Sequence, residues 1–92
     1  MRIEFDPHKR ALTLANRGLD MAEAEAVFDT PTLTIDDDRV DYGEPRYITI
    51  GTLRGRMVVI VWTPRGDACR IISMRKANER EQSLYRPRLE RP

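Results

Sequence analysis

The chain has 92 residues and a formal net charge of +1 at pH 7, with 40% hydrophobic and 34% charged residues. This length fits one small globular domain, and the apolar content excludes a wholly disordered chain. No apolar run approaches the roughly 20 residues that span a membrane, and the first residues lack the apolar stretch of a signal peptide. The single cysteine, Cys69, excludes an internal disulfide framework and a cysteine-based zinc site. We therefore expect a reducing, cytoplasmic setting.

The small net charge conceals an uneven distribution. Residues 1–46 contain 6 Lys and Arg against 11 Asp and Glu, whereas residues 47–92 contain 10 against 4. Arginine outnumbers lysine by 14 to 2. Because a guanidinium group presents paired donors to phosphate or carboxylate, this pattern indicates an anionic partner, with RNA, DNA or an acidic protein all open. A genome rich in G and C is an alternative explanation for the arginine, but not for the separation of the charges.

The N-terminal segment predicts a short strand and a helix. Residues 2–5 alternate in polarity, and Asp6 followed by Pro7 has the residues of a helix start. The expected helix covers residues 7–17 and ends at Gly18, which tolerates the left-handed conformation of a helix stop. Its predicted apolar stripe consists of Ala11, Leu14 and Ala15.

Two further helices begin with residues at capping-box spacing. One is expected over residues 20–29, and the other from residue 78 until Pro87 stops it. In each, a polar cap residue is followed three positions later by glutamate. The two pairs are Asp20 with Glu23, and Asn78 with Glu81.

The middle of the chain predicts strands. Residues 46–53 alternate in polarity, and 57–62 are continuously apolar, as in a strand that is buried on both faces. Segments 33–35 and 70–74 add shorter candidates, and the short glycine-bearing connections suit an antiparallel meander. We therefore expect an α+β fold: an antiparallel sheet of three to four main strands, with two N-terminal helices and one C-terminal helix packed on one face. The run at residues 36–38, three aspartates, is expected to form a solvated turn.

Three segments of the sequence together form a recognisable pattern. They are Phe5-Asp6-Pro7-His8-Lys9 with Gly18 and Ala24-x-x-x-Phe28; Tyr42-Gly43-Glu44-Pro45-Arg46-Tyr47-Ile48-Thr49-Ile50-Gly51; and Arg70-Ile71-Ile72-Ser73-Met74-Arg75-Lys76-Ala77-Asn78-Glu79-Arg80-Glu81. With these segments the chain resembles the BrnT family of toxins, and the resemblance covers nearly the whole chain, from about residue 3 to 86. It suggests a single toxin domain over residues 1–86 and a basic tail over 87–92.

This resemblance implies a fold, an activity and a partner. BrnT toxins are similar in fold to RelE-like ribonucleases, belong to bacterial type II toxin–antitoxin pairs, and inhibit translation by cutting RNA. Their partner is a BrnA antitoxin, a ribbon-helix-helix protein, through which the complex binds operator DNA and represses its own operon. Toxin and antitoxin assemble as dimers of each. No metal or organic cofactor and no membrane partner are implied.

One departure from the family pattern concerns proton transfer. The family usually has N-x-x-K-H-G before the second helix, where this chain has Thr13, Asn16, Arg17 and Gly18. Arg17 therefore stands in the position of the usual histidine. The absence of this histidine leaves open a second interpretation, a non-catalytic module that binds the antitoxin and acts in operon repression. A plain nucleic-acid-binding domain is the third interpretation.

Metal-free RNA cleavage requires a base for the 2′-hydroxyl, cations for the phosphate and an acid for the leaving oxygen. Arg46 and Arg75 each stand at the end of a predicted strand, and we expect both at one rim of the sheet, gripping the phosphate. The alternative is that they only solvate the sheet edge. Glu81 is a candidate base or a partner that holds an arginine, although its capping role also explains it.

The remaining candidates rest mainly on the resemblance. Lys9 and Tyr85 match family positions and are expected at the catalytic site, beside Arg46, Arg75 and Glu81. Tyr47 either stacks on a base or packs beneath a helix. Together with Tyr47, the expected RNA-binding residues are Arg70 and Arg80. The antitoxin is expected to cover the basic surface with acidic or apolar segments.

Overall fold

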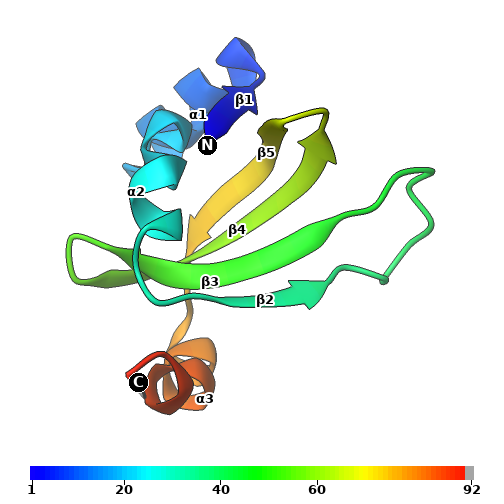
Figure 1. Cartoon of the computed structure of the whole chain (residues 1–92). Helices are drawn as coiled ribbons and strands as arrows, with labels where there is room; N and C mark the ends of the chain where they lie inside the picture. Colours follow the sequence, from blue (N-terminus) through cyan, green and yellow to red (C-terminus); the bar gives the residue numbers. More distant parts are fainter. Residues whose placement is uncertain (91–92) are drawn as a thin grey trace.

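The computed structural model describes residues 1–90. The elements in chain order are β1 (Arg2–Phe5), α1 (Pro7–Arg17), the 3₁₀ helix η1 (Met21–Glu23), α2 (Ala24–Phe28), β2 (Leu33–Asp36), β3 (Tyr47–Leu53), β4 (Arg56–Arg65), β5 (Ala68–Lys76) and α3 (Glu79–Leu89). One five-stranded sheet has the order β1-β5-β4-β3-β2 (Figure 1). The α+β class is confirmed.

The sheet differs from the prediction in its edges. β1 is a full member of the sheet and pairs with β5 in parallel, so the sheet is mixed. The other neighbours are antiparallel, as expected. Nearly all the other elements lie between β1 and β5 in the chain, and a connection of this length permits β1 to pair in parallel with β5. β4 and β5 are also longer than predicted, because each continues into the turn that joins them.

α1 has the predicted ends but not the predicted buried side. The Asp6 carboxylate accepts a hydrogen bond from the His8 amide at 2.8 Å, and Gly18 ends the helix with φ of 68°. Thr13 is the buried residue of α1, whereas Leu14 is 47% exposed. The prediction of the apolar stripe was therefore wrong. Its other members, Ala11 and Ala15, are exposed as well.

The second predicted helix is two short pieces, η1 and α2. The capping box expected at its start is wrong, because the Glu23 carboxylate forms an ion pair with Arg54 of the β3–β4 turn. The apolar residues Met21, Ala24 and Val27 face the core, and Val27 of α2 is fully buried. A Cβ on Gly51 of β3 would lie 2.7 Å from Val27 Cγ1, so glycine there allows α2 to pack directly on the sheet.

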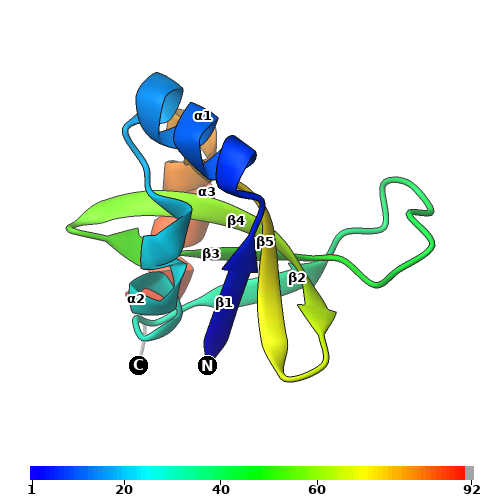
Figure 2. The same cartoon turned by 90° about the horizontal axis from the view of Figure 1, so that it is seen from above.

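The helices cover both faces of the sheet, which corrects the expectation of a single helical face. Figure 1 shows α1 and α2 above the sheet and α3 below it, and Figure 2 gives the view from above. On the α1–α2 face, Val58, Ile60 and Met74 pack with residues of η1 and α2. On the α3 face, a smaller cluster includes Ile50 and Val59, and α3 packs against it through Tyr85 and Leu89.

α3 has the predicted start and a later end. The Asn78 side chain accepts from the Glu81 amide, and the Glu81 carboxylate accepts from the Asn78 amide, which confirms the capping box. Pro87 does not stop the helix, which continues to Leu89. A proline near a helix end removes few hydrogen bonds, and the packing of Leu89 against the sheet favours the last turn. Of the predicted tail, residues 91–92 lie outside the described part.

No helix within residues 1–90 is long and apolar enough to cross a membrane.

Candidate functional site

A β-bulge brings two of the predicted arginines to the same face of the sheet. Arg70 and Arg75 are five residues apart, so a regular strand would turn them to opposite faces. The register of β4 with β5 shifts between Val61 and Trp62, which leaves Ile72 as an additional residue in β5. As a result, both arginines lie on the α3 face.

Arg46 joins them on this face. The Asp37 amide donates to the Arg46 carbonyl at 2.9 Å, which extends the pairing of β2 with β3 by one position. Arg46 is two residues before Ile48, which packs toward the α3-side cluster. Strand alternation therefore directs the Arg46 side chain to the same side of the sheet as Arg75. Arg46 and Arg75 thus share a face, but the expectation of a common rim was wrong. Arg46 precedes Tyr47, which pairs with Trp62, whereas Arg75 pairs with Val59, several positions further along the sheet.

Arg75 is held by a two-point ion pair with Glu81 of α3. Its Nη1 and Nη2 donate to the two carboxylate oxygens of Glu81, each at 2.8 Å. The guanidinium of Arg75, with a smaller contribution from the Asn78 amide, lowers the pKa of Glu81 from 4.5 to about 2. Glu81 is therefore ionised at neutral pH, and both its oxygens are engaged. This geometry gives Glu81 a positioning role and makes it a poor proton acceptor.

Arg46 is oriented by its own loop. Its guanidinium carbon lies 3.9 Å from the centre of the Tyr42 ring, and its Nε lies 3.3 Å from a Glu44 carboxylate oxygen. The arginine side chain is 23% exposed, so it is partly withdrawn from solvent. A cation–π contact and an ion pair on two sides restrict the guanidinium to few orientations. Arg46 is thus preorganised as a cation at the start of β3.

Arg39 is a further cation of the site that the sequence did not single out. Its Nε and Nη2 donate to the two carboxylate oxygens of Asp37, at 2.7 and 2.8 Å. The Asp37 side chain is fully buried, so the prediction of a solvated turn was wrong for this residue. The positive charge of Arg39 opposes the rise that Glu81 causes in the pKa of Arg75. The spacing of Asp37 and Arg39 was the available sign of this pair.

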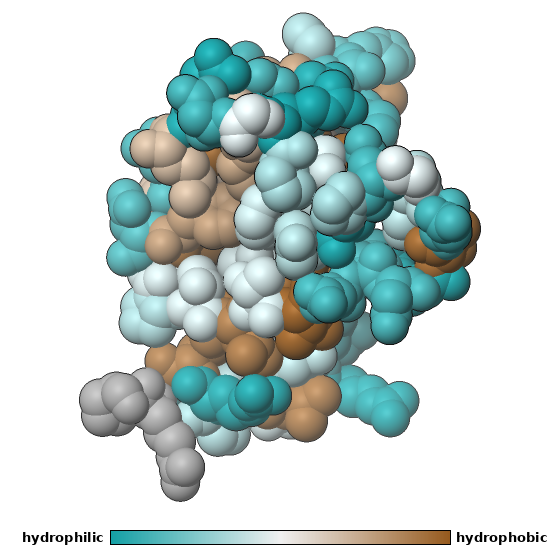
Figure 3. Space-filling model, turned by 45° about the vertical axis from the view of Figure 1, so that its right-hand side comes forward, coloured by the Kyte–Doolittle hydropathy of each residue, from teal (hydrophilic) through white to brown (hydrophobic). Residues whose placement is uncertain are grey.

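We call Arg39, Arg46 and Arg75 the arginine clamp. The loop that carries Arg39 projects beyond β2 and β3 in Figure 1. In Figure 3 the corresponding right-hand side is largely hydrophilic, with hydrophobic surface beside it lower down. A polar surface next to an apolar one accommodates both phosphates and bases.

Some predicted site residues lie close to this region. Tyr85 is one helical turn after Glu81 on the same side of α3 and packs on the α3-side cluster. Arg70 shares the face of the clamp but lies toward β1, with Nη1 3.8 Å from a Glu4 carboxylate oxygen. Arg80 is exposed in the first turn of α3.

Two predicted residues lie elsewhere. Tyr47 is on the opposite face of the sheet, where its ring lies 5.0 Å from that of Trp62, which in turn contacts Phe28 of α2. This placement favours packing beneath a helix over base stacking at the clamp. Lys9 lines a groove between α1 and β5, with Arg17 and Ser73 among its neighbours. The structure does not bring these two residues to the clamp.

Arg17, in the position of the usual family histidine, has a structural contact. Its Nη1 donates to the carbonyl oxygen of Met74 at 2.9 Å. β1 pairs with β5 only as far as Ile71, so this carbonyl belongs to the open part of the strand edge. Arg17 thereby satisfies an edge acceptor and fastens the end of α1 to the sheet.

Comparison with known families identifies the chain. Residues 5–81 match the family described as "Ribonuclease toxin, BrnT, of type II toxin-antitoxin system". The chain belongs to this family. The matched residues include the whole arginine clamp and its partner Glu81. Membership implies a ribonuclease toxin and an antitoxin partner. A comparison with curated proteins finds no significant match.

For a ribonuclease of this family, the clamp supplies cations but no base. Arginine remains protonated at any physiological pH and cannot accept a proton. The one histidine, His8, is exposed at the start of α1. Cys69 is buried, and burial raises the pKa of its thiol to about 11, so it is not a nucleophile at neutral pH. Within residues 1–90, no group of three or more His, Cys, Asp or Glu is placed to hold a metal ion.

Proposed function

We propose that this protein is the toxin of a type II toxin–antitoxin pair that cleaves RNA without a metal ion and so inhibits translation in the cytoplasm. A BrnA-like ribbon-helix-helix antitoxin neutralises it and carries the complex to operator DNA, as a dimer of toxin–antitoxin pairs. Family membership supports the toxin and the ribonuclease class. The geometry of the arginine clamp supports the metal-free mechanism.

The observation that carries the proposal is the fixed position of Arg75 on the face of the sheet that also carries Arg46. Glu81 holds Arg75 at two points, Arg46 lies on the same face by strand alternation, and Arg39 is bound to Asp37, whose amide donates to the Arg46 carbonyl. Charge that develops on a phosphate during cleavage is stabilised by cations that are already oriented. The clamp therefore favours the transition state of phosphodiester cleavage over uniform binding of RNA.

The proton-transfer steps need residues other than the clamp. We assign one of them to the hydroxyl of Tyr85, which lies on the Glu81 side of α3. Arg70 and Arg80 extend the positive surface along the sheet and α3, where they can contact neighbouring phosphates. Lys9 and Tyr47 lie away from the arginine clamp, so they can contact only an RNA that extends beyond the clamp.

The test is RNA cleavage by Arg75→Ala. Removal of a preorganised cation is expected to lower the cleavage rate by about 10²–10³-fold. The matched control is Arg88→Ala, since Arg88 is an exposed arginine of α3 outside the clamp, and its rate should stay within about twofold of the wild type. Circular dichroism checks that both variants fold. A wild-type rate in folded Arg75→Ala would remove Arg75 from the site.

One observation favours a second function. Arg17 replaces a residue type that can transfer protons and instead fastens the edge of β5 through Met74. The alternative is therefore a non-catalytic module that binds its antitoxin and acts in operon repression. Overexpression distinguishes the two: the toxin arrests growth, and the neighbouring gene product relieves the arrest. A purified protein that leaves RNA intact while it binds the antitoxin would favour the alternative.

A further inference from the structure

A second positively charged site lies at the β3–β4 hairpin, apart from the arginine clamp. It is an open pocket of about 420 Å³. Its walls come from the hairpin, from the end of β5 and from α3. We call it the hairpin pocket, and the four cationic residues among those that line it are Arg54, Arg56, Lys76 and Arg86.

The charges of this pocket are unbalanced. No aspartate or glutamate is among the described residues that line it. Arg54 has an acidic partner outside the pocket, Glu23, to which its Nη2 donates at 3.1 Å. Arg56 and Lys76 are exposed and form no ion pair with a carboxylate of residues 1–90. Such a concentration of positive charge attracts an anion.

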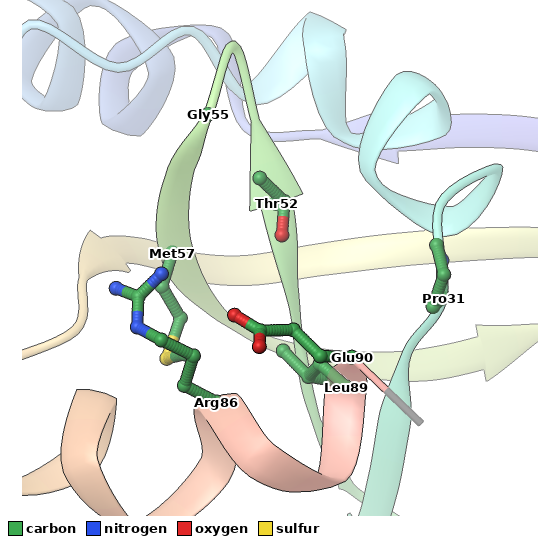
Figure 4. A pocket seen from close by; sticks show the side chains of 7 residues that line it. All are labelled: Pro31, Thr52, Gly55, Met57, Arg86, Leu89 and Glu90. Atoms are coloured by element: carbon green, nitrogen blue, oxygen red, sulfur yellow. The ribbon is translucent and has the colours of Figure 1, made fainter. Parts of the chain in front are cut away.

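The fourth cation is oriented by a fixed amide. Gln82 donates from Nε2 to the Ala77 carbonyl at 3.0 Å and accepts from Arg86 Nη2 at 3.1 Å. Figure 4 shows the small neighbouring pocket of about 100 Å³, where the Arg86 side chain reaches from α3 toward Met57. The guanidinium of Arg86 is thus directed back to the sheet.

The walls of the pocket belong to regular elements. The Ala77 amide donates to the Met57 carbonyl at 3.0 Å and ties the end of β5 to the start of β4. Arg54 and Gly55 both have positive φ, 49° and 78°, as in the two-residue turns that match strand twist. A tight hairpin and a tied strand end keep the spacing of the cations, which reduces the ordering cost of binding.

We propose that the hairpin pocket binds a backbone phosphate of the RNA at a position next to the one held by the arginine clamp. This inference rests on the proposed ribonuclease function. Lys76 directly follows Arg75 at the end of β5, so the two side chains leave the strand on opposite faces. Because adjacent Cα atoms are only about 3.8 Å apart, one RNA strand that bends around this end of the sheet can contact both sites. An acidic protein segment fits less well, because the larger apolar side chain of the pocket, Met57, is only 5% exposed. Phosphate and ribose need little apolar surface.

The test measures binding of a single-stranded 2′-O-methyl RNA oligonucleotide, which lacks the nucleophile for cleavage, by fluorescence anisotropy. The variant Arg56→Gln/Lys76→Gln is expected to bind about tenfold more weakly. The slope of log affinity against log salt should fall in magnitude by about 0.7 for each phosphate that the variant no longer neutralises. The matched control, Arg2→Gln/Arg88→Gln, removes the same charge from two other exposed arginines and should retain wild-type affinity to within about twofold.

Two outcomes overturn the inference, and neither affects the proposed function. One is equal loss of RNA affinity in the variant and its control, which would show only an effect of net charge. The other is unchanged RNA affinity with weakened binding of the antitoxin, which would make the pocket an acidic-protein site. The proposed function is tested separately by cleavage of unmodified RNA by the wild-type chain. Urea unfolding confirms that each variant is folded.

Discussion

The two faces of the sheet differ in what they bury. On the face beneath α1, η1 and α2, ten buried residues of the described chain form one cluster, whereas four form the cluster beneath α3. The α3 face instead carries the arginine clamp and its partner Glu81. Strand alternation allows one sheet to bury a large apolar cluster on one face and to carry the arginine clamp on the other, because neighbouring residues of β3, β4 and β5 point to opposite sides. Stability is concentrated on one face and charge on the other.

The largest predicted loss of stability comes from a cavity in the larger cluster, on the α1–α2 face. Ile60 of β4 is fully buried there, so Ile60→Ala should lower the free energy of unfolding by about 2–5 kcal/mol. Val61, the next residue, is half-buried and points to the α3 face. Val61→Ala should cost about 1 kcal/mol or less, because a smaller and partly exposed group is removed. Urea denaturation followed by circular dichroism measures both, and equal losses would contradict the division.

A pH titration sharpens the comparison, because each face has an acid whose pKa is lowered to about 2. Arg10, followed by the Ala22 amide, lowers the pKa of Asp20 from 3.8 to about 2, and Arg75 lowers that of Glu81 from 4.5 to about 2. A pKa that is lower in the folded chain adds stability above the ordinary pKa and loses it as the pH falls toward 2. Each pair should contribute about 1 kcal/mol or less, since both guanidinium groups are over 40% exposed.

The two acids should nevertheless differ in function. Asp20→Asn and Glu81→Gln should each flatten the loss of stability between about pH 4.5 and pH 2, where the two carboxylates would otherwise take up protons. Only Glu81→Gln should slow RNA cleavage, by about tenfold, because it loosens Arg75 without removing it. Parallel unfolding and cleavage assays of the two variants give both readouts. Equal cleavage by the two variants would refute a positioning role for Glu81.

The smallest effect is expected on the outer side of α1. Leu14 is 47% exposed there, so Leu14→Ala should change the free energy of unfolding by less than about 0.5 kcal/mol. Leu19, by contrast, is 3% exposed in the larger cluster, and Leu19→Ala serves as the comparison, with a loss of about 2 kcal/mol or more. Thermal unfolding of the two variants measures both losses of stability. A large loss for Leu14→Ala would place α1 in the core after all.

Local chemistry made much of the fold predictable. Asp6 and Gly18 mark the ends of α1, and Asn78 with Glu81 marks the start of α3, because a cap depends on residues within one turn of each other. The apolar run at 57–62 predicted the central strand for a similar reason. The edges of the sheet were less predictable, since the pairing of β1 with β5 joins segments more than 60 residues apart.

The candidate site was predictable only in its residue types. Arg46 and Arg75 were expected at strand ends, but their common face with Arg70 depends on the bulge at Ile72, which appears only in the register between two strands. Arg39 was missed because its importance comes from the burial of Asp37 and from the pairing of Asp37 with Arg46 at the start of β3. Neither can be read from neighbours in sequence.

The sequence by itself determined the helix caps, the buried central strand, the arginine-rich second half and the resemblance to the family to which the chain belongs. The tertiary structure decided which side of each element is buried: α1 turns its apolar stripe outward, and α3 crosses to the opposite face. The physical reason is the distance along the chain over which each interaction acts. Caps and strand periodicity act within a few residues, whereas the placement of a side chain on one face or another depends on strand pairing and packing over the whole chain.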